Sequence, residues 1–149
     1  MTKEEILNLV PQQQPFRFID EIVELNEAGI VASYTFKPDE TFYAGHFPGN
    51  PVTPGVILLE TMAQTGVVAF GIYLASKEMS IDEINKILTV FTEAEVEFSG
   101  MVQPGEKVTI KARKVYFRRL KLKVEAEIIN QRGEVVCSAT IAGIGVRQK

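Results

Sequence analysis

VILLETMAQTGVVAFGIYL, residues 56–74, is the apolar stretch that decides the fold. It is too long for a β-strand, and it is apolar nearly all round, whereas a surface helix is apolar along one stripe. We therefore expect a central helix that is buried on most of its sides. Thr53 is predicted to cap the N-terminus of this helix, with Pro54 at the first helical position and Gly55 after it.

The segments on either side of the helix alternate apolar and polar residues, which is the pattern of half-buried β-strands. A short N-terminal helix is also expected, because Thr2 and Glu5 fit a capping box and Pro11 ends the helical pattern. Residues 15–23 are expected to form a strand or an extended segment. Further strands are predicted at residues 30–37, 87–100, 108–112, 120–128 and 135–146, and turns are expected at 26–29, 102–105 and 130–133. An antiparallel sheet wrapped around one long helix is the economical α+β solution, and we expect one domain over residues 1–149.

Composition limits the classes of function. The net charge of −3 over 149 residues argues against a dedicated nucleic-acid-binding protein. One cysteine and one histidine make an all-protein zinc site improbable, and Cys137 is expected in the core. The acidic N-terminus lacks the long apolar stretch of a signal peptide, and Glu60 interrupts the segment that is long enough to span a membrane. We therefore expect a cytoplasmic protein with no membrane span.

Two polar residues stand out inside the apolar helix. Glu60 and Gln64 are four residues apart, so they share one helix face and can touch. Burial would raise the pKa of the Glu60 carboxyl toward a range where it can hold and donate a proton, and Gln64 could orient it. The alternative is a surface glutamate, or a buried one that backbone groups satisfy.

His46 is the chain's only histidine, and it lies in a loop rich in proline and glycine. A rigid loop favours a general base, since geometry is the first requirement of proton transfer; the alternative is a structural histidine. Gly55 lies at the helix start, where free N–H groups could bind a developing oxyanion, unless nothing binds there. A base, a proton donor and an oxyanion site together suggest the β-elimination of water from a carbonyl compound, or the reverse reaction.

The stretch GHFPGNPVTPGVILLETMAQ, residues 45–64, resembles the active-site signature of the β-hydroxyacyl-acyl carrier protein dehydratases, which have the hotdog fold. That signature runs Gly-His-Phe-Pro, then Pro-Val-Met-Pro-Gly-Val, then Glu-Ala-x-Ala-Gln. Weaker similarity covers nearly the whole chain, including residues 15–20 and the strand-turn VEFSGMVQPGE. Thr53 replaces the common Met, Thr61 replaces the common Ala, and glutamines replace the usual His-Arg-Tyr before Pro15. Divergent members of this kind also serve pigment and aryl-polyene pathways.

The resemblance implies a role for each residue of the motif. His46 would remove the α-proton, and Glu60 would protonate the departing hydroxyl. The Gly55 N–H would polarise the thioester carbonyl, Gln64 would hold Glu60, and Phe47 would contact the substrate. The family uses no metal and no organic cofactor, and its substrate hangs on the phosphopantetheine arm of acyl carrier protein. The family's histidine and carboxylate come from different subunits of a dimer, so a homodimer or higher homo-oligomer is expected.

The stretch RKVYFRRLKLK, residues 113–123, is the one positive cluster on an acidic chain. In the family, an acidic carrier protein docks on basic side chains near the tunnel mouth. The alternative is an ordinary solvated strand face with cross-strand charge pairs. The candidate docking residues are Arg113, Lys114, Arg118, Arg119 and Lys121.

The sequence therefore predicts a 3-hydroxyacyl-acyl carrier protein dehydratase of fatty-acid or polyene biosynthesis. One rival is a hotdog acyl thioesterase, in which a carboxylate activates water. The other is a non-catalytic acyl-binding partner subunit. The intact His-Phe-Pro-Gly loop disfavours the first rival, and the presence of both His46 and Glu60 disfavours the second.

Overall fold

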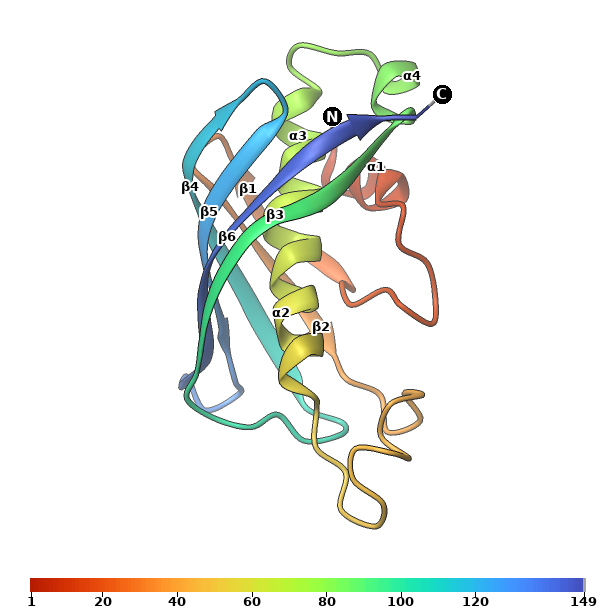
Figure 1. Cartoon of the computed structure of the whole chain (residues 1–149), viewed down its shortest axis with the longest axis vertical. Helices are drawn as coiled ribbons and strands as arrows, with labels where there is room; N and C mark the ends of the chain where they lie inside the picture. The colour runs from red at the N-terminus through yellow and green to blue at the C-terminus, as the bar shows by residue number, and fades with distance from the viewer. Residues whose placement is uncertain (149) are drawn as a thin grey trace.

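A six-stranded antiparallel sheet curves around one long helix in the computed structural model, which describes residues 1–148 (Figure 1). This is the predicted α+β hotdog arrangement, with the helix on the concave side of the sheet. In spatial order the strands are β1 (Glu21–Asn26), β2 (Gly29–Thr35), β4 (Lys107–Arg118), β5 (Lys121–Ile129), β6 (Val135–Arg147) and β3 (Ile87–Phe98).

The central helix confirms the prediction from the apolar stretch. It begins as α2 (Gly55–Ala63), continues through a π-helical segment, η1 (Gln64–Ala69), and ends as α3 (Phe70–Ala75). By length and composition the segment could cross a membrane, but 67% of its most apolar window is buried against the sheet. It is therefore the core helix of the fold. The π-helical segment was not predicted, because its residues have the same apolar pattern as their α-helical neighbours.

The start of the helix differs from the prediction in one respect. Thr53 does not cap it: Pro54 occupies the N-cap position, and no side chain accepts a hydrogen bond from the first turn. The Thr53 hydroxyl instead hydrogen-bonds the buried hydroxyl of Tyr43, with 2.6 Å between the oxygens. Thr53 thus lies one residue before the N-cap with its hydroxyl directed to Tyr43, and the helix begins without a side-chain cap.

The other short elements follow the sequence signals. Helix α1 (Lys3–Leu9) begins with the predicted capping box between Thr2 and Glu5, and α4 (Ile81–Ile84) has a second one. The turn before β2 is closed by the Asn26 side chain, which accepts hydrogen bonds from the next backbone N–H groups. Gly105 and Gly133 adopt positive φ angles in the two other predicted turns.

The core lies between the helix and the concave face of the sheet. Alternate residues of the strands point into it, including Ile30, Tyr34 and Ile110, each at most 2% exposed. Cys137 is also buried, as predicted, and burial raises the pKa of its thiol to about 11.

Strand β3 is an edge strand, and its side chains are less covered than those of the other long strands. Glu93, Glu95 and Glu97 form the predicted exposed row. On the opposite side of the strand, only Val96 is partly buried, while Ala94 and Phe98 are exposed. β3 lies at the edge of the sheet, paired with β6 alone, so the backbone groups on its other side are also left open.

Candidate active site

The loop between β2 and α2 holds His46 in a fixed orientation. The backbone N–H of His46 donates to the carbonyl of Phe42 (3.1 Å), and its carbonyl accepts from the N–H of Val52 (2.9 Å). Its Nδ1 lies 2.9 Å from the carbonyl oxygen of Val52. Because a carbonyl oxygen can only accept, this bond places the proton of the neutral ring on Nδ1. The lone pair of Nε2 is then available to take a proton from a substrate.

Phe47 covers one side of this imidazole. The two rings are stacked, with 4.2 Å between their centroids, and the Phe47 side chain is 54% exposed. The tip of the loop is closed by mutual backbone hydrogen bonds between Phe47 and Asn50. An exposed aromatic ring beside the base is a suitable contact for an incoming apolar or thioester group.

Glu60 and Gln64 are in contact on the central helix, as their spacing predicts. The Gln64 Nε2 donates to Glu60 Oε2 at 2.9 Å. Glu60 is half-buried, and loss of hydration raises the pKa of its carboxyl, while the hydrogen bond from Gln64 opposes part of that rise. A raised pKa increases the fraction of Glu60 that carries a proton at a given pH, as a general acid requires.

Gln64 is itself fully buried and has partners for both ends of its amide. Its Oε1 accepts from the backbone N–H of Phe18 (2.7 Å), and its Nε2 also donates to the carbonyl of Phe16 (2.9 Å). The extended N-terminal segment is thereby attached to the helix at the level of Glu60. The π-helical segment begins at Gln64, and such segments are frequent at functional sites.

Gly55 is the first residue of α2, and no hydrogen-bond acceptor is found for its N–H within residues 1–148. The helix dipole adds partial positive charge there, so the position suits an oxyanion. A Cβ on Gly55 would lie 3.0–3.1 Å from ring atoms of Phe98. An alanine at this position would therefore require the Phe98 ring to move by a few tenths of an ångström.

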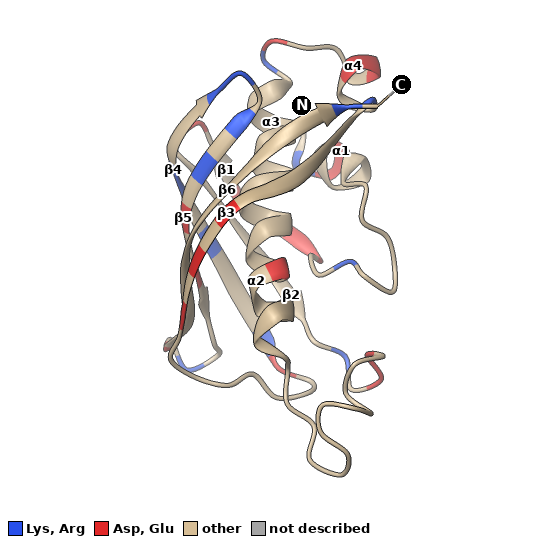
Figure 2. Ribbon diagram, viewed as in Figure 1, with Lys and Arg blue, Asp and Glu red and all other residues tan. Residues whose placement is uncertain are grey.

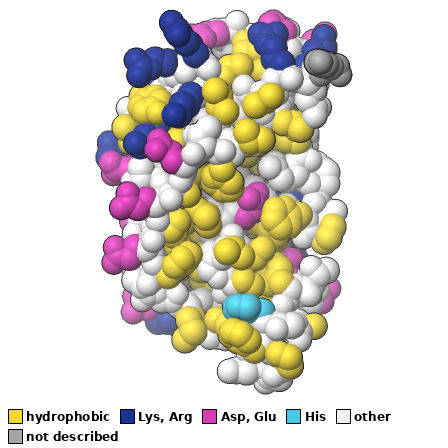
Figure 3. All heavy atoms as spheres, viewed as in Figure 1, with side chains coloured by type: hydrophobic (Ala, Val, Ile, Leu, Met, Phe, Trp, Pro, Cys, Tyr) yellow, Lys and Arg dark blue, Asp and Glu magenta, His cyan; other side chains and the backbone are white. Residues whose placement is uncertain are grey.

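Within one chain, the predicted base and acid are not in direct contact. His46 and Glu60 share no hydrogen bond or ion pair in the described residues. The His46 side chain, cyan in Figure 3, lies toward the end of the molecule where α2 begins. The acidic position on α2, red in Figure 2, lies further along the helix. The structure thus brings Glu60 and Gln64 together and leaves His46 on a separate element.

The sequence of this chain matches a known protein family. The family model described as a FabA-like domain matches residues 10–141, which include every candidate catalytic residue. The chain belongs to the FabA-like family.

Curated relatives of this FabA-like chain are named as dehydratases. It is 38% identical to the 3-hydroxyacyl-[acyl-carrier-protein] dehydratase FabZ of Chlamydia trachomatis serovar L2, over 73% of this chain and 69% of that protein. It is 35% identical to FabZ of Shewanella pealeana, over 95% of this chain and 90% of that protein. The bifunctional enzyme LpxC/FabZ of Chlorobaculum tepidum is 34% identical over 97% of this chain, which spans only 30% of that longer protein.

Solved structures show the same fold at low sequence identity. The dehydratase heterocomplex ApeI:P of Xenorhabdus doucetiae contains a chain with a TM-score of 0.79 and 14% identity, covering 95% of this chain and 91% of that one. Thioesterase HI1161 of Haemophilus influenzae has a TM-score of 0.65 and 16% identity, covering 99% of this chain and 92% of that one. At these identities the likeness shows the hotdog fold, which dehydratases and thioesterases share.

The candidate docking residues of this FabA-like chain differ in their surroundings. Arg113 lies on β4 in an exposed ion pair with Glu125, 2.7 Å apart, as the alternative of cross-strand pairing expects. Arg118, Arg119 and Lys121 lie at the β4–β5 turn, where Figure 2 shows blue segments at the end of the sheet away from the α2 start. Arg118 and Arg119 are exposed and make no ion pair within residues 1–148. Lys114, on β4, also makes no ion pair within residues 1–148, so the cross-strand pairing with Glu125 removes only Arg113 from the candidate docking residues.

Sequence reasoning missed two contributions to the site. One is the Tyr43–Thr53 hydrogen bond, whose only sequence signal was the Thr at a position where the family motif has Met. The other is the attachment of Phe16 and Phe18 to Gln64, which runs through backbone groups and leaves no signal in side-chain type.

Proposed function

We propose that this chain is a 3-hydroxyacyl-acyl carrier protein dehydratase, a hydro-lyase that forms the trans-2-enoyl thioester. The observation that carries the proposal is the half-buried Glu60 carboxyl with its raised pKa, held by Gln64 on the helix that Gly55 begins. The FabZ relatives support the same reaction by their names. Fatty-acid biosynthesis is the pathway class of this reaction, and polyene biosynthesis uses the same step.

In the proposed mechanism, His46 Nε2 removes a proton from C2 of the acyl chain. The electrons of the C2–H bond form the C2=C3 double bond, and the C3–O bond breaks. The leaving hydroxyl takes the proton of Glu60 and departs as water. The Gly55 N–H stabilises the negative charge that develops on the thioester oxygen. Return of the proton from His46 to Glu60 through solvent restores the site.

We infer that a complete site needs two copies of the chain, as the resemblance implies, with His46 from one copy and Glu60 from the other. The open edge of β3 supports such pairing: it is 12 residues long, whereas the other edge strand, β1, has 6. A long edge strand with exposed apolar side chains is a template for strand pairing. Figure 3 shows hydrophobic side chains spread over the face that carries this edge. The large exposed apolar side chains of β3 itself are Leu88, Val90, Phe91 and Phe98.

Two-fold pairing of β3 edges would also bring the positive turn to the site. One end of β3 lies at the start of α2, where Phe98 packs against Gly55. The other end lies near the β4–β5 turn: Thr89 pairs with Gly145, and the N–H of Gly145 donates to the carbonyl of Leu120 in that turn. An antiparallel pair reverses one strand, so the turn of one copy lies at the end where its partner presents the His46 loop.

This arrangement supports the docking of acyl carrier protein on Arg118, Arg119 and Lys121. An acidic carrier would be attracted to that turn over a distance and reach the shared site with its prosthetic arm. Charge reversal at Arg118 and Arg119 should raise KM for a carrier-bound substrate and leave KM for a pantetheine thioester unchanged. An equal effect on both substrates would contradict docking at the turn.

The test of the proposed function is hydration of crotonyl-acyl carrier protein, followed as loss of enoyl-thioester absorbance. The wild type should hydrate this substrate, and His46→Ala and Glu60→Gln should each lose roughly 100- to 10,000-fold in rate. Release of free thiol instead would establish the thioesterase. Binding of the carrier without turnover on any acyl chain would establish the non-catalytic partner subunit.

A further inference from the structure

Tyr43 and Thr53 lie at the two ends of the segment that carries His46, and their side chains meet. The Tyr43 Oη is 2.6 Å from Thr53 Oγ1, and the two residues are only 4% and 5% exposed. No second hydrogen-bond partner is found for either hydroxyl in residues 1–148. The bond therefore closes the loop at its base, in the core, while His46 and the loop tip face outward.

Each end of this bond is attached to a different part of the fold. The N–H of Tyr43 donates to the backbone carbonyl of Glu40. The Tyr43 ring packs edge-on against the Phe42 ring, with 4.7 Å between their centroids. The N–H of Thr53 donates to the backbone carbonyl of Val102, a fully buried residue in the loop before β4. The hydroxyl pair thus joins the chain that enters the loop to the chain that leaves it for the helix.

Between these ends, the position of His46 depends on Val52, the neighbour of Thr53. Val52 receives the Nδ1–H of the imidazole and donates its own N–H to the His46 carbonyl. A shift of Thr53 would move Val52, and with it the ring, relative to Gly55 two residues further along. The rest of the loop offers no other side-chain hydrogen bond across its base among the described residues.

We propose that the Tyr43–Thr53 hydrogen bond is a positioning device that sets the orientation of the His46 base and its distance from the helix start. The proposal rests on the dehydratase function proposed above for its kinetic readout. It also explains why a hydroxyl residue is accommodated where the family motif has Met: the buried hydroxyl has a partner of its own kind. Tyr43 and Thr53 do not touch the reacting atoms in this account; they act through His46.

The test uses Tyr43→Phe, Thr53→Val, the double variant and Thr53→Ser, in the full chain. The first two variants remove one hydroxyl and keep the shape, and Thr53→Ser keeps the hydroxyl. Because a small misplacement of a base can cost up to about 100-fold in rate, we expect kcat to fall by roughly 10- to 100-fold in both single variants, with KM little changed. The loss of kcat in the double variant should be no larger than in either single variant, and Thr53→Ser should retain activity.

A second readout does not depend on activity. The chain has one histidine, so the imidazole Cε1–H signal in an NMR spectrum belongs to His46 without further assignment. Its chemical shift should change in Tyr43→Phe, Thr53→Val and the double variant, and should be preserved in Thr53→Ser. Tyr73→Phe, which removes a tyrosine hydroxyl on α3, is the matched control and should leave the signal in place.

A merely structural hydroxyl pair predicts a different pattern. Leaving one buried hydroxyl unpaired costs stability, whereas removing both restores much of it. Activity that returns in the double variant together with stability would therefore overturn the proposal, as would an unchanged His46 signal in both single variants. An inactive wild type would overturn the proposed function alone, since the His46 signal would still decide whether the hydroxyl pair positions the ring.

Discussion

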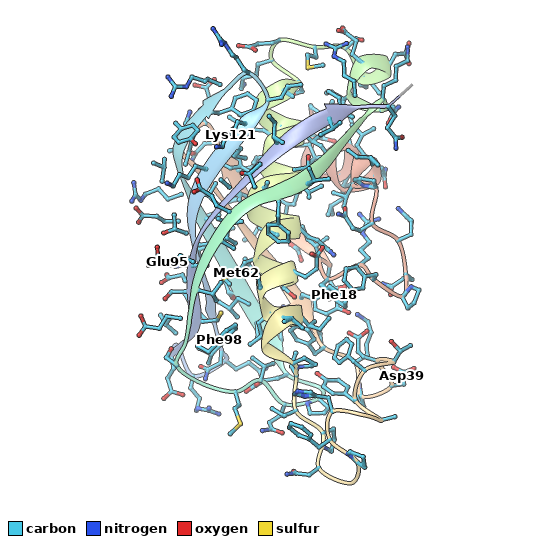
Figure 4. All side chains as sticks on the ribbon, viewed as in Figure 1. Phe18, Asp39, Met62, Glu95, Phe98 and Lys121 are labelled. Carbon is cyan, nitrogen blue, oxygen red and sulfur yellow. The ribbon has the colours of Figure 1, made fainter. Side chains whose placement is uncertain are left out.

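The amide of Gln64 lies 2.9 Å from the carboxyl of Glu60 and joins that acid to the N-terminal segment of the chain. The same amide binds the backbone at Phe16 and Phe18, so one fully buried side chain connects the helix, the acid and the segment before β1. Phe18 of this segment is labelled beside the central helix in Figure 4. The orientation of the acid is therefore coupled to residues more than forty positions away in sequence.

Replacement of Gln64 by Met should raise the pKa of Glu60 further. The hydrogen bond from Gln64 favours the charged carboxylate, so its loss leaves burial as the main influence. In a ¹³C NMR titration, the carboxyl signal of Glu60 is identified by its absence from the Glu60→Gln variant. This signal should titrate at higher pH in the Gln64→Met variant than in the wild type. Stability should also fall, by about 1–3 kcal/mol for each buried backbone group left unpaired. A lower pKa of Glu60 in the Met variant would contradict the account.

Replacement of Glu60 by Gln should stabilise the protein at neutral pH while removing activity. The pKa of Glu60 is raised in the folded chain above its ordinary value of 4.5, so the folded state binds more protons than the unfolded state between the two values. The free energy of unfolding therefore falls as pH rises through that window. A glutamine at position 60 does not ionise, so its variant does not lose this free energy of unfolding, and its side-chain oxygen can still accept the hydrogen bond from Gln64.

Thermal melts of the two proteins at several pH values check this prediction. The Glu60→Gln variant should melt higher than the wild type above the window, and the difference should shrink as pH falls below 4.5. A difference that is independent of pH would show that the titration of Glu60 is not its cause.

Replacement of Gly55 by Ala should impair turnover through Phe98. The new Cβ would lie 3.0–3.1 Å from ring atoms of Phe98, so the ring or the first helical turn must shift. We expect a loss of about tenfold in kcat, because the N–H that stabilises the oxyanion moves with the turn. Adding Phe98→Leu should relieve the crowding and recover part of the loss, with Phe98→Leu alone as the control. No recovery would mean that the alanine acts by another route.

Mixing His46→Ala with Glu60→Gln should restore activity if each site is shared between two copies. Random exchange of subunits makes half of the dimers mixed, and each mixed dimer has one intact site out of two, which gives about a quarter of wild-type activity. The control is a mixture of His46→Ala with the variant that carries both changes, in which no site is intact. Activity that stays at the background level in the first mixture would place both residues of a site in one chain.

The sequence predicted those parts of the fold that depend on local pattern. The buried helix followed from an apolar run too long for a strand, and the contact of Glu60 with Gln64 followed from helical spacing. The cap at Thr53 was predicted wrongly, since the competing partner, Tyr43, is ten residues away and meets it only in the folded loop. The exposed side of β3 was missed for a similar reason, because alternation does not show which strand lies at an edge.

The division of the basic stretch also depends on the fold. In sequence, Arg113 and Arg118 belong to one positive run. In the sheet, Arg113 faces Glu125 across the β4–β5 pair, whereas Arg118 lies at the turn and has no acidic neighbour within ion-pair distance in residues 1–148. Register between strands, which the sequence of one strand does not contain, decides which charges are free.

The most direct test of the central claim is hydration of crotonyl-acyl carrier protein in ¹⁸O-labelled water, analysed by mass spectrometry of the intact acyl carrier. The dehydratase account predicts a 3-hydroxybutyryl group that stays attached to the carrier and holds the heavy oxygen at C3, formed by the wild type and not by His46→Ala or Glu60→Gln. Free carrier thiol together with crotonate that holds the heavy oxygen in its carboxylate would contradict the account and identify a thioesterase.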